Sequence, residues 1–300
     1  MISIDSARSF QELLVPDAAP APYEYATLFA GEGWIARRRA KRRFDLLKKL
    51  DAKLRAMLAP DERVYFVTAG TTSSFAEQFF VGWVAAYLNR RALVFTTHRV
   101  LLIQIDSRKR PKELLSQLRY DQIASVRSTW TGICEVKLHG GVKYKFQQVP
   151  KAERKFLHQF LADIVKPAGG GVGGARNQLE LLCPKCFVVV PGLPAACPTC
   201  HAPFKSAKKA AMLSLIFPGL GDFYLGHRGF AVLEMIGSAF LWVALVILPL
   251  INGGHHDEET GEMVPVNGIY WAIAFGMIAI AHIIDSRMTR HFALKGHHPA

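Results

Sequence analysis

The spacing of hydrophobic and polar residues changes three times along the chain. From Trp34 to Leu58, apolar residues recur every three or four positions, which predicts an amphipathic helix. Short β-branched and aromatic runs separated by turn residues follow, and they predict six strands. The expected strands cover residues 63–70, 92–97, 99–106, 123–129, 132–138 and 142–147. A second helical pattern covers residues 152–165, so the strands are closed by a helix.

Strands followed by one amphipathic helix predict a small β-sandwich or barrel whose open end the helix covers. The corner at His139-Gly140-Gly141 predicts a hairpin between the last two strands. An apolar insertion at residues 75–88 has helical spacing and begins with the capping pattern Ser74-x-x-Glu77. This extra helix either pads the sandwich or enters lipid.

Two long apolar runs near the C-terminus, 229–251 and 266–284, predict membrane-spanning helices. The loop between them, residues 252–265, carries four acidic residues and no lysine or arginine, whereas both outer flanks are basic. The positive-inside rule therefore places the N- and C-termini in the cytoplasm and the acidic loop outside.

The apolar segment at 211–226 is interrupted by Pro218 and by glycines. A third span here would move one basic flank across the membrane, so an interfacial or re-entrant segment is preferred, with a short first span as the alternative. Within the spans, Glu234 and His282 either reach water near the helix ends, or pair with each other, or coordinate an ion.

Four cysteines, Cys183, Cys186, Cys197 and Cys200, form two CxxC pairs separated by ten residues. Two such turns offer four thiolates, which is the ligand set of a tetrahedral structural Zn²⁺ site. The set leaves no open coordination position, and the module is too small for a large core, so the metal is expected to stabilise its fold.

Other interpretations of the cysteines fit less well. Cys197-Pro-Thr-Cys200-His201 matches the haem-attachment pattern, but that chemistry requires an exported domain and leaves the other pair unexplained. A redox dithiol lacks a thioredoxin-like context. Binding of nucleic acid by the module is disfavoured because Lys185 is its only cation.

The chain has 300 residues and a net charge of +13, for which anionic lipid at a cytoplasmic membrane surface is the simplest partner. The basic block that would contact such lipid consists of Arg37, Arg38, Arg39, Lys41, Arg42 and Arg43. The alternative is a solvated helix face, and nucleic acid is a weaker third possibility. The first 30 residues lack the basic start and apolar stretch of a secretory signal, so the domain before the spans is expected to be cytoplasmic.

Two segments resemble bacterial pleckstrin-homology-like (PH-like) domains. Leu93–Leu102 (LVFTTHRVLL) resembles their hairpin of two apolar strands around a Thr-x-x-Arg turn, and Tyr120–Val126 (YDQIASV) resembles a second element of that family. The resemblance covers residues 61–166. It implies a binding or docking platform and not an enzyme.

Residues 217–229 (FPGLGDFYLGHRG) resemble a family of small domains with two membrane helices around an FYLG turn. The family carries an acid-Arg-Phe triplet there, whereas Asp222-Phe223-Tyr224 lacks the central arginine. The resemblance implies a membrane anchor. Its turn motif comprises Gly219, Gly221, Asp222, Phe223, Tyr224 and Gly226.

The sequence thus predicts an α+β multidomain membrane protein. Its expected parts are an N-terminal region (1–60), a PH-like domain (61–166), a glycine-rich linker (167–180), a zinc ribbon (181–204), a membrane domain (207–292) and a tail (293–300). No nucleophile triad, phosphate-binding glycine loop or HExxH string is present, so we expect no enzyme.

The leading hypothesis is a scaffold or sensor in the bacterial inner membrane that docks an anionic lipid headgroup or an unidentified protein, and a homo-oligomer is compatible with it. A regulatory or structural subunit of a small transport or channel assembly is the alternative. Membrane-tethered binding of nucleic acid is the weakest of the three hypotheses.

Overall fold

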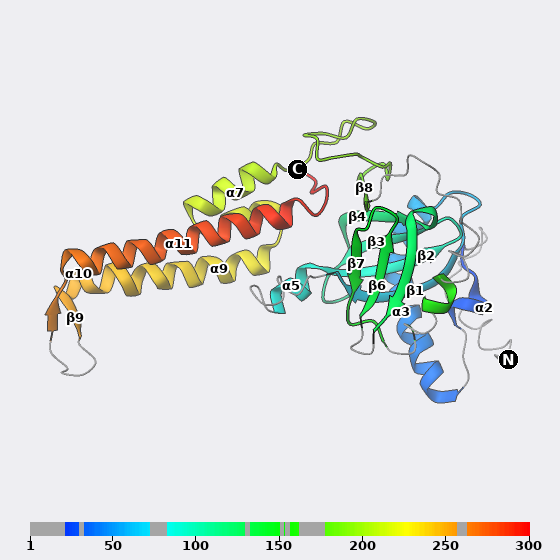
Figure 1. Ribbon diagram of the computed structural model, residues 1–300, viewed down its shortest axis with the longest axis horizontal. Helices are drawn as coiled ribbons and strands as arrows, with labels where there is room; N and C mark the ends of the chain where they lie inside the picture. Colours follow the sequence, from blue (N-terminus) through cyan, green and yellow to red (C-terminus); the bar gives the residue numbers. More distant parts are fainter. Residues whose placement is uncertain are drawn as a thin grey trace. The chain divides into compact units, whose positions relative to one another are not determined.

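The computed structural model separates into two compact units, Met1–Gly192 and Leu193–Ala300 (Figure 1). It describes residues 22–29, 33–72, 83–129, 133–150, 153, 157–161, 178–256 and 263–300. The first unit contains two antiparallel sheets with flanking helices, and the second is mainly helical.

The larger sheet of the first unit has five strands in the order β1-β2-β3-β4-β8, with every neighbouring pair antiparallel. Its strands are β1 (Val64–Thr71), β2 (Arg90–Thr96), β3 (Arg99–Ile105), β4 (Pro111–Arg119) and β8 (Glu180–Leu182). The smaller sheet contains β5 (Ile123–Ser128), β6 (Cys134–Leu138) and β7 (Lys143–Phe146). Gly141, at a positive φ of 82°, makes the turn between β6 and β7. Neither sheet closes on itself within the described residues.

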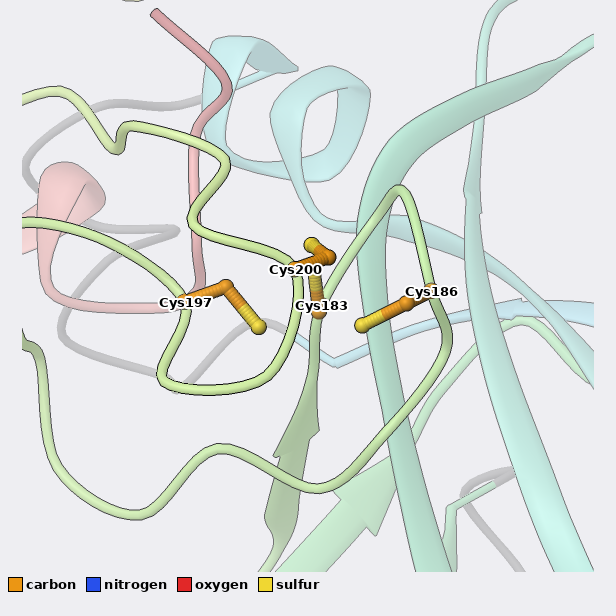
Figure 2. A group of neighbouring side chains, drawn as sticks. All are labelled: Cys183, Cys186, Cys197 and Cys200. Carbon is orange, nitrogen blue, oxygen red and sulfur yellow. The ribbon is translucent and has the colours of Figure 1, made fainter.

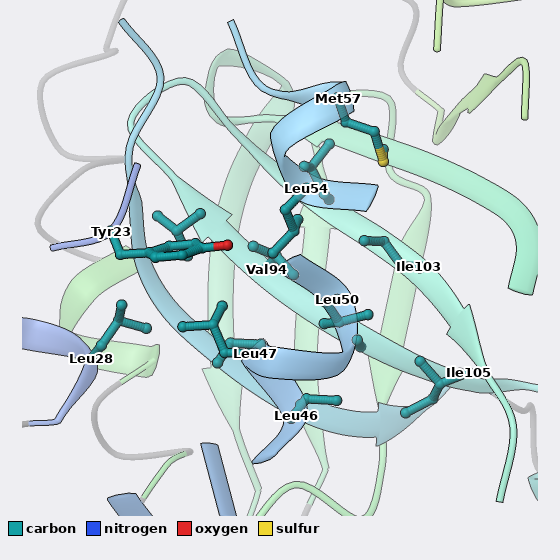
Figure 3. Close-up of a cluster of buried hydrophobic side chains, with 14 of the residues drawn as sticks. Tyr23, Leu28, Leu46, Leu47, Leu50, Leu54, Met57, Val94, Ile103 and Ile105 are labelled. Atoms are coloured by element: carbon teal, nitrogen blue, oxygen red, sulfur yellow. The ribbon is translucent and has the colours of Figure 1, made fainter. Parts of the chain in front are cut away.

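Two hydrophobic clusters cover the two faces of the larger sheet. Helix α3 (Gly33–Met57) packs Leu47, Leu50 and Leu54 against one face, where Val94 points (Figure 3). The second cluster joins the opposite face, through residues such as Leu93, to the smaller sheet and to the helical segment 157–161. Because β2 and β3 are buried on both faces, their sequences are continuous apolar runs and do not alternate.

The predicted helix at 34–58 and the six predicted strands all appear, with ends shifted by up to two residues. Strand β4 was not predicted, because its sequence PKELLSQLR is rich in good helix formers and pairing with β3 overrides that preference. Strand β8 was also missed. It places the first residues of the predicted zinc ribbon, Leu181 and Leu182, at the edge of the sheet beside β4.

Several predicted elements lie partly or wholly outside the described residues. Of the expected helix at 75–88, the structure describes α5 (Trp83–Leu88). Of the expected helix at 152–165, Glu153 and residues 157–161 are described, and both are helical. Residues 162–177, which include most of the expected linker, lie outside. Two short elements complete the first unit, α2 (Tyr25–Leu28) and a 3₁₀ turn at Tyr120–Gln122.

The second unit contains two helices that are long and apolar enough to cross a membrane, Arg228–Asn252 and Gly268–Ala293. The first comprises α9 (Arg228–Trp242), a π-helical turn (Val243–Ile247) and α10 (Leu248–Asn252). The second is α11 (Gly268–Ala293), and the two run antiparallel (Figure 1). At 25 and 26 residues they exceed the roughly 20 residues that a bilayer core requires. Short strands β9 (Gly254–His256) and β10 (Met263–Pro265) pair at the tip.

The segment at 211–226 does not form one continuous helix. Helix α7 (Ala207–Ile216) begins at Ser206, whose Oγ accepts a hydrogen bond from the Lys209 N–H, and it lies along α11 (Figure 1). A second helix, α8 (Leu220–Leu225), follows after Gly219, which has a φ of 88°. Ten residues of α7 extend about 15 Å, roughly half of a bilayer core.

The predicted tail, residues 293–300, is held against the start of the second unit. The Lys205 N–H donates to the His298 carbonyl at 2.8 Å, and the Ala300 N–H donates to the Pro203 carbonyl at 3.1 Å. The rings of Phe204 and His297 stack with centroids 4.4 Å apart. The tail therefore covers the chain just before α7.

Candidate functional site

The two CxxC segments adopt the same backbone conformation. In each, the residue after the second cysteine has a left-handed backbone, Phe187 at φ 60° and His201 at φ 56°. The N–H groups of these residues donate to the carbonyls of Cys183 and Cys197, both at 3.0 Å. Each first cysteine also donates its N–H to the carbonyl five residues later, at 2.9 Å in both segments. Two equivalent turns of this kind present their thiols in the same way.

The four thiols converge (Figure 2). Their sulfur atoms all lie within 4.8 Å of one another, with Cys183 and Cys197 buried and Cys186 and Cys200 partly exposed. A tetrahedral ion bound to sulfur at about 2.3 Å separates its ligands by roughly 3.8 Å, which this grouping allows. The Lys185 N–H lies 3.4 Å from the Cys183 sulfur, where it can stabilise a thiolate. The donor set therefore suits a metal ion that prefers soft ligands.

Convergence of both pairs also bears on the other interpretations of the cysteines. A haem-attachment site or a redox dithiol uses one CxxC pair, whereas here each pair faces the other (Figure 2). The boundary between the two units of the chain, after Gly192, falls within the spacer between the pairs. The cysteine module thus occupies the position in the sequence where the sheet domain ends and the helical unit begins.

The basic block on α3 is smaller than the sequence predicted. Its exposed members are Arg37, Arg38, Lys41 and Arg42, and Arg39 is partly exposed. Arg43 is 8% exposed and is a core residue instead. Its Nε donates to Glu153 at 3.2 Å, its Nη1 donates to the Leu28 carbonyl at 2.9 Å, and its guanidinium lies 4.5 Å from the centre of the Phe66 ring.

Burial determines the chemistry of Arg43. Loss of solvent lowers the pKa of its guanidinium, and the Glu153 carboxylate opposes that effect. The prediction that Arg43 contacts lipid therefore does not hold, because helical periodicity places it on the face of α3 that packs inward.

The glycine-rich turn positions α8 against its neighbours. A side chain at Gly221 would place its Cβ 2.2 Å from the Ala210 carbonyl oxygen, so α7 and α8 require glycine for their close approach. Gly219 and Gly226 both have left-handed backbones that glycine accommodates at no steric cost. The Tyr224 hydroxyl accepts a hydrogen bond from the Ser206 N–H, and Phe223 is exposed. The motif residues thus have identifiable structural roles.

Asp222 in this turn is 1% exposed and belongs to a buried polar group. Its Oδ1 lies 2.7 Å from His227 Nδ1, and its Oδ2 accepts a hydrogen bond from the Thr289 hydroxyl at 2.6 Å. Carboxylate oxygens of Asp222, Glu234 and Asp285 all lie within 4.8 Å of one another. Like charges so close repel one another, and a cation among them would relieve that repulsion.

The sequence singled out Glu234 and, separately, Asp222, but not their grouping with Asp285. A pairing of Glu234 with His282 is not observed, because His282 Nδ1 contacts the Leu215 carbonyl at 2.9 Å and His282 Nε2 accepts from Trp242 Nε1 at 3.4 Å. Asp285 lies one helical turn after His282, and Asp222 comes from a different helix. The grouping depends on tertiary contacts among α8, α9 and α11, for which no local sequence signal exists.

Comparison of the chain with protein-family models and with curated proteins found no match. Functional conclusions therefore rest on the sites themselves.

Proposed function

We propose that this protein is a non-enzymatic scaffold or sensor of the bacterial inner membrane, in which a zinc ribbon follows a PH-like docking domain and precedes a membrane hairpin. The observation that carries the proposal is the convergence of four thiols from two equivalent turns. A closed set of four thiolates holds Zn²⁺ without leaving a position for substrate, so the ion has a structural role.

The arrangement of the first unit supports the PH-like assignment. Four strands of one sheet are followed by three strands of a second sheet and then by a helical segment at 157–161 that contributes to the core between them. The fifth strand, β8, is an addition to the edge of that sandwich. Such a domain offers loops and a sheet surface for docking, and it contributes no catalytic group by itself.

Anionic lipid is the partner that the charge distribution favours. The exposed cations of α3 include Arg38, Lys41 and Arg42, and Trp34 near the start of the helix is 71% exposed. At about 1 kcal/mol per cation, this face would contribute a few kcal/mol to membrane attachment. With both termini in the cytoplasm, the face and the zinc ribbon lie on the same side of the bilayer as the anionic leaflet.

The metal content of the full chain, purified from membranes in neutral detergent, tests the proposal. We expect one tightly bound zinc per chain by elemental mass spectrometry, lost in Cys197→Ser/Cys200→Ser protein. Cys134→Ala is the matched control, because Cys134 lies in β6 outside the cysteine module. Metal-free or cytosolic wild-type protein would contradict the proposal.

Proximity labelling with an N-terminal tag then tests whether the zinc ribbon docks a protein partner or has only a structural role. A protein partner lost in Cys197→Ser/Cys200→Ser cells, at equal expression, makes the ribbon a docking element. An unchanged set of partners limits the ribbon to a structural role and directs attention to the PH-like domain.

A transport or channel subunit is the second candidate, and the position of Glu234 in the first candidate span favours it. Ion flux in proteoliposomes that Glu234→Gln abolishes would support this function. Binding of DNA or RNA through α3 is weaker, and a steep salt dependence would be its signature.

A further inference from the structure

Three acidic side chains from three different helices meet inside the helical unit. Carboxylate oxygens of Asp222 in α8, Glu234 in α9 and Asp285 in α11 all lie within 4.8 Å of one another. Asp222 and Asp285 are buried, and no lysine or arginine forms an ion pair with any of the three among the described residues. The group therefore brings together up to three negative charges without a lysine or arginine to compensate them.

Hydrogen bonds satisfy only part of this carboxylate group. Asp222 contacts His227 Nδ1 at 2.7 Å and accepts from the Thr289 hydroxyl at 2.6 Å. Asp285 accepts from a backbone N–H at 3.2 Å. Glu234 is different, because its Oε2 is buried and has no hydrogen-bond partner in the described structure. A buried carboxylate oxygen without a donor is costly, so Oε2 is suited to an additional ligand.

A second buried oxygen without a partner lies beside the carboxylates. Ser238 is 6% exposed, and its Oγ has no hydrogen-bond partner among the residues described. It lies one helical turn after Glu234 and one turn before Trp242, on the same face of α9. That face meets α11, because Trp242 Nε1 donates to His282 Nε2 and Glu234 groups with Asp285. Since helical side chains tilt toward the N-terminus, the Ser238 hydroxyl is directed toward the turn of Glu234.

We propose that this group binds one divalent cation that prefers oxygen ligands, such as Mg²⁺ or Mn²⁺. Carboxylate oxygens are the ligands that these ions favour, and a hydroxyl is a suitable neutral addition. At bond lengths of about 2.1–2.4 Å, two oxygens on opposite sides of such an ion are about 4.2–4.8 Å apart. Oxygens within 4.8 Å of one another can therefore share one ion. Two positive charges also offset more of the repulsion than a monovalent ion or a single proton does.

A cation at this position links three helices. Glu234 lies six residues after the start of the first candidate span, and Asp285 lies eight residues before the end of the second. At 1.5 Å per residue, the group is roughly 9–12 Å from the same end of the two antiparallel helices (Figure 1). The positive-inside rule assigns that end to the cytoplasm, from which the ion would enter. The inference goes beyond the scaffold function, since it requires neither the zinc ribbon nor lipid.

Titration of Mn²⁺ into the full chain in neutral detergent, followed by electron paramagnetic resonance, tests the proposal, because binding removes the sharp signal of free Mn²⁺. We expect one site per chain, from which excess Mg²⁺ displaces Mn²⁺. Glu234→Gln removes a ligand charge from an oxygen that has no hydrogen-bond partner, so its affinity should be at least about tenfold weaker. Asp285→Asn, on the opposite helix, should weaken binding to a similar extent.

Glu258→Gln/Glu259→Gln is the matched control, because it removes two carboxylates from the acidic loop between the spans. We expect it to change the affinity of the site less than about twofold, since solvent and salt screen distant charges. Circular dichroism of each variant confirms its helical content before affinities are compared. A site that is lost in this control and retained in Glu234→Gln and Asp285→Asn would be adventitious and would overturn the proposal.

Thermal unfolding gives a second readout. Saturating Mn²⁺ should raise the Tm of wild type more than that of Glu234→Gln, because a ligand stabilises the state that binds it. No Mn²⁺ binding by wild type, or equal affinities in wild type and both cluster variants, would overturn the proposal. Zinc content of the same preparations reports on the ribbon alone, so a failure of the cation site and a failure of the zinc site are distinguishable.

Discussion

The two units of the chain accommodate buried carboxylates in opposite ways. In the sheet domain, Glu62 is 1% exposed and accepts hydrogen bonds from Arg99 Nε at 2.9 Å and Nη2 at 2.8 Å. Glu153 is likewise buried and paired with Arg43. In the helical unit, Asp222, Glu234 and Asp285 group with one another, and no lysine or arginine pairs with them in the described structure.

The difference reflects what each environment offers. The start of the central strand β3 and the long amphipathic helix α3 bring arginine side chains within reach of an acid, and charge-assisted hydrogen bonds compensate for lost solvation. Between apolar helices, cations are costly, so hydroxyl and histidine side chains contact the acids instead. Removal of one partner should therefore have opposite consequences in the two units.

The largest effect is expected from Arg99→Met, which leaves the Glu62 carboxylate buried without its ion pair. A loss of about 3–5 kcal/mol in the free energy of unfolding is the usual result of breaking a buried pair. Urea unfolding of the full chain in detergent, followed by hydrogen exchange at β2 and β3, measures it. Arg110→Met is the control, since the Arg110 side chain is 63% exposed and its pair with Asp106 should contribute less than about 1 kcal/mol.

Gly221→Ala should be next in magnitude, because α7 and α8 cannot separate without disturbing the contact of Thr289 with Asp222. We expect a loss of about 1–3 kcal/mol, typical of overpacking. Thermal unfolding in detergent provides the measurement. Gly237→Ala lies on the same helical unit with nothing within 4 Å of the added Cβ, and it should be neutral or slightly stabilising.

Glu234→Gln and Glu62→Gln are expected to differ in the sign of their effect on stability. In buffer without divalent cations, removing one of three neighbouring carboxylates should leave the helical unit unchanged or stabilise it by about 1 kcal/mol. Glu62→Gln, by contrast, weakens the pair with Arg99 and should destabilise the sheet domain. Thermal unfolding of both variants decides the matter. Marked destabilisation by Glu234→Gln would show that a full negative charge is needed there, as for a bound cation.

The smallest effect is a dependence of stability on pH in the sheet domain. Burial alone would raise the pKa of Glu62, but hydrogen bonds from Arg99, Thr96 and the Ala59 N–H outweigh it and hold the pKa below its usual value. Its stabilising contribution is therefore fully present above the pKa of the unfolded chain, about 4.3, and is lost as the pH falls through the lower folded value. Unfolding at pH 3 to 6 measures this, and Glu62→Gln should flatten the dependence.

Local patterns in the sequence were sufficient for most of the helices and strands and for the two cysteine pairs. Apolar spacing identified α3 and both long apolar helices, and β-branched runs identified six strands, because these signals depend on near neighbours. The cysteine pairs were equally plain, since the spacing within each pair already determines the local turn that presents both thiols.

Tertiary structure alone decided the rest. Strand β4 has a helical composition and becomes a strand because β3 and β8 pair with it. In the sequence, Arg43 is one more cation of a basic block. In the structure, packing against Phe66 and Glu153 buries it. The carboxylate group joins residues up to 63 positions apart, Asp222 and Asp285. A sequence pattern reports which face a residue prefers, whereas the partner it meets there depends on how distant segments pack.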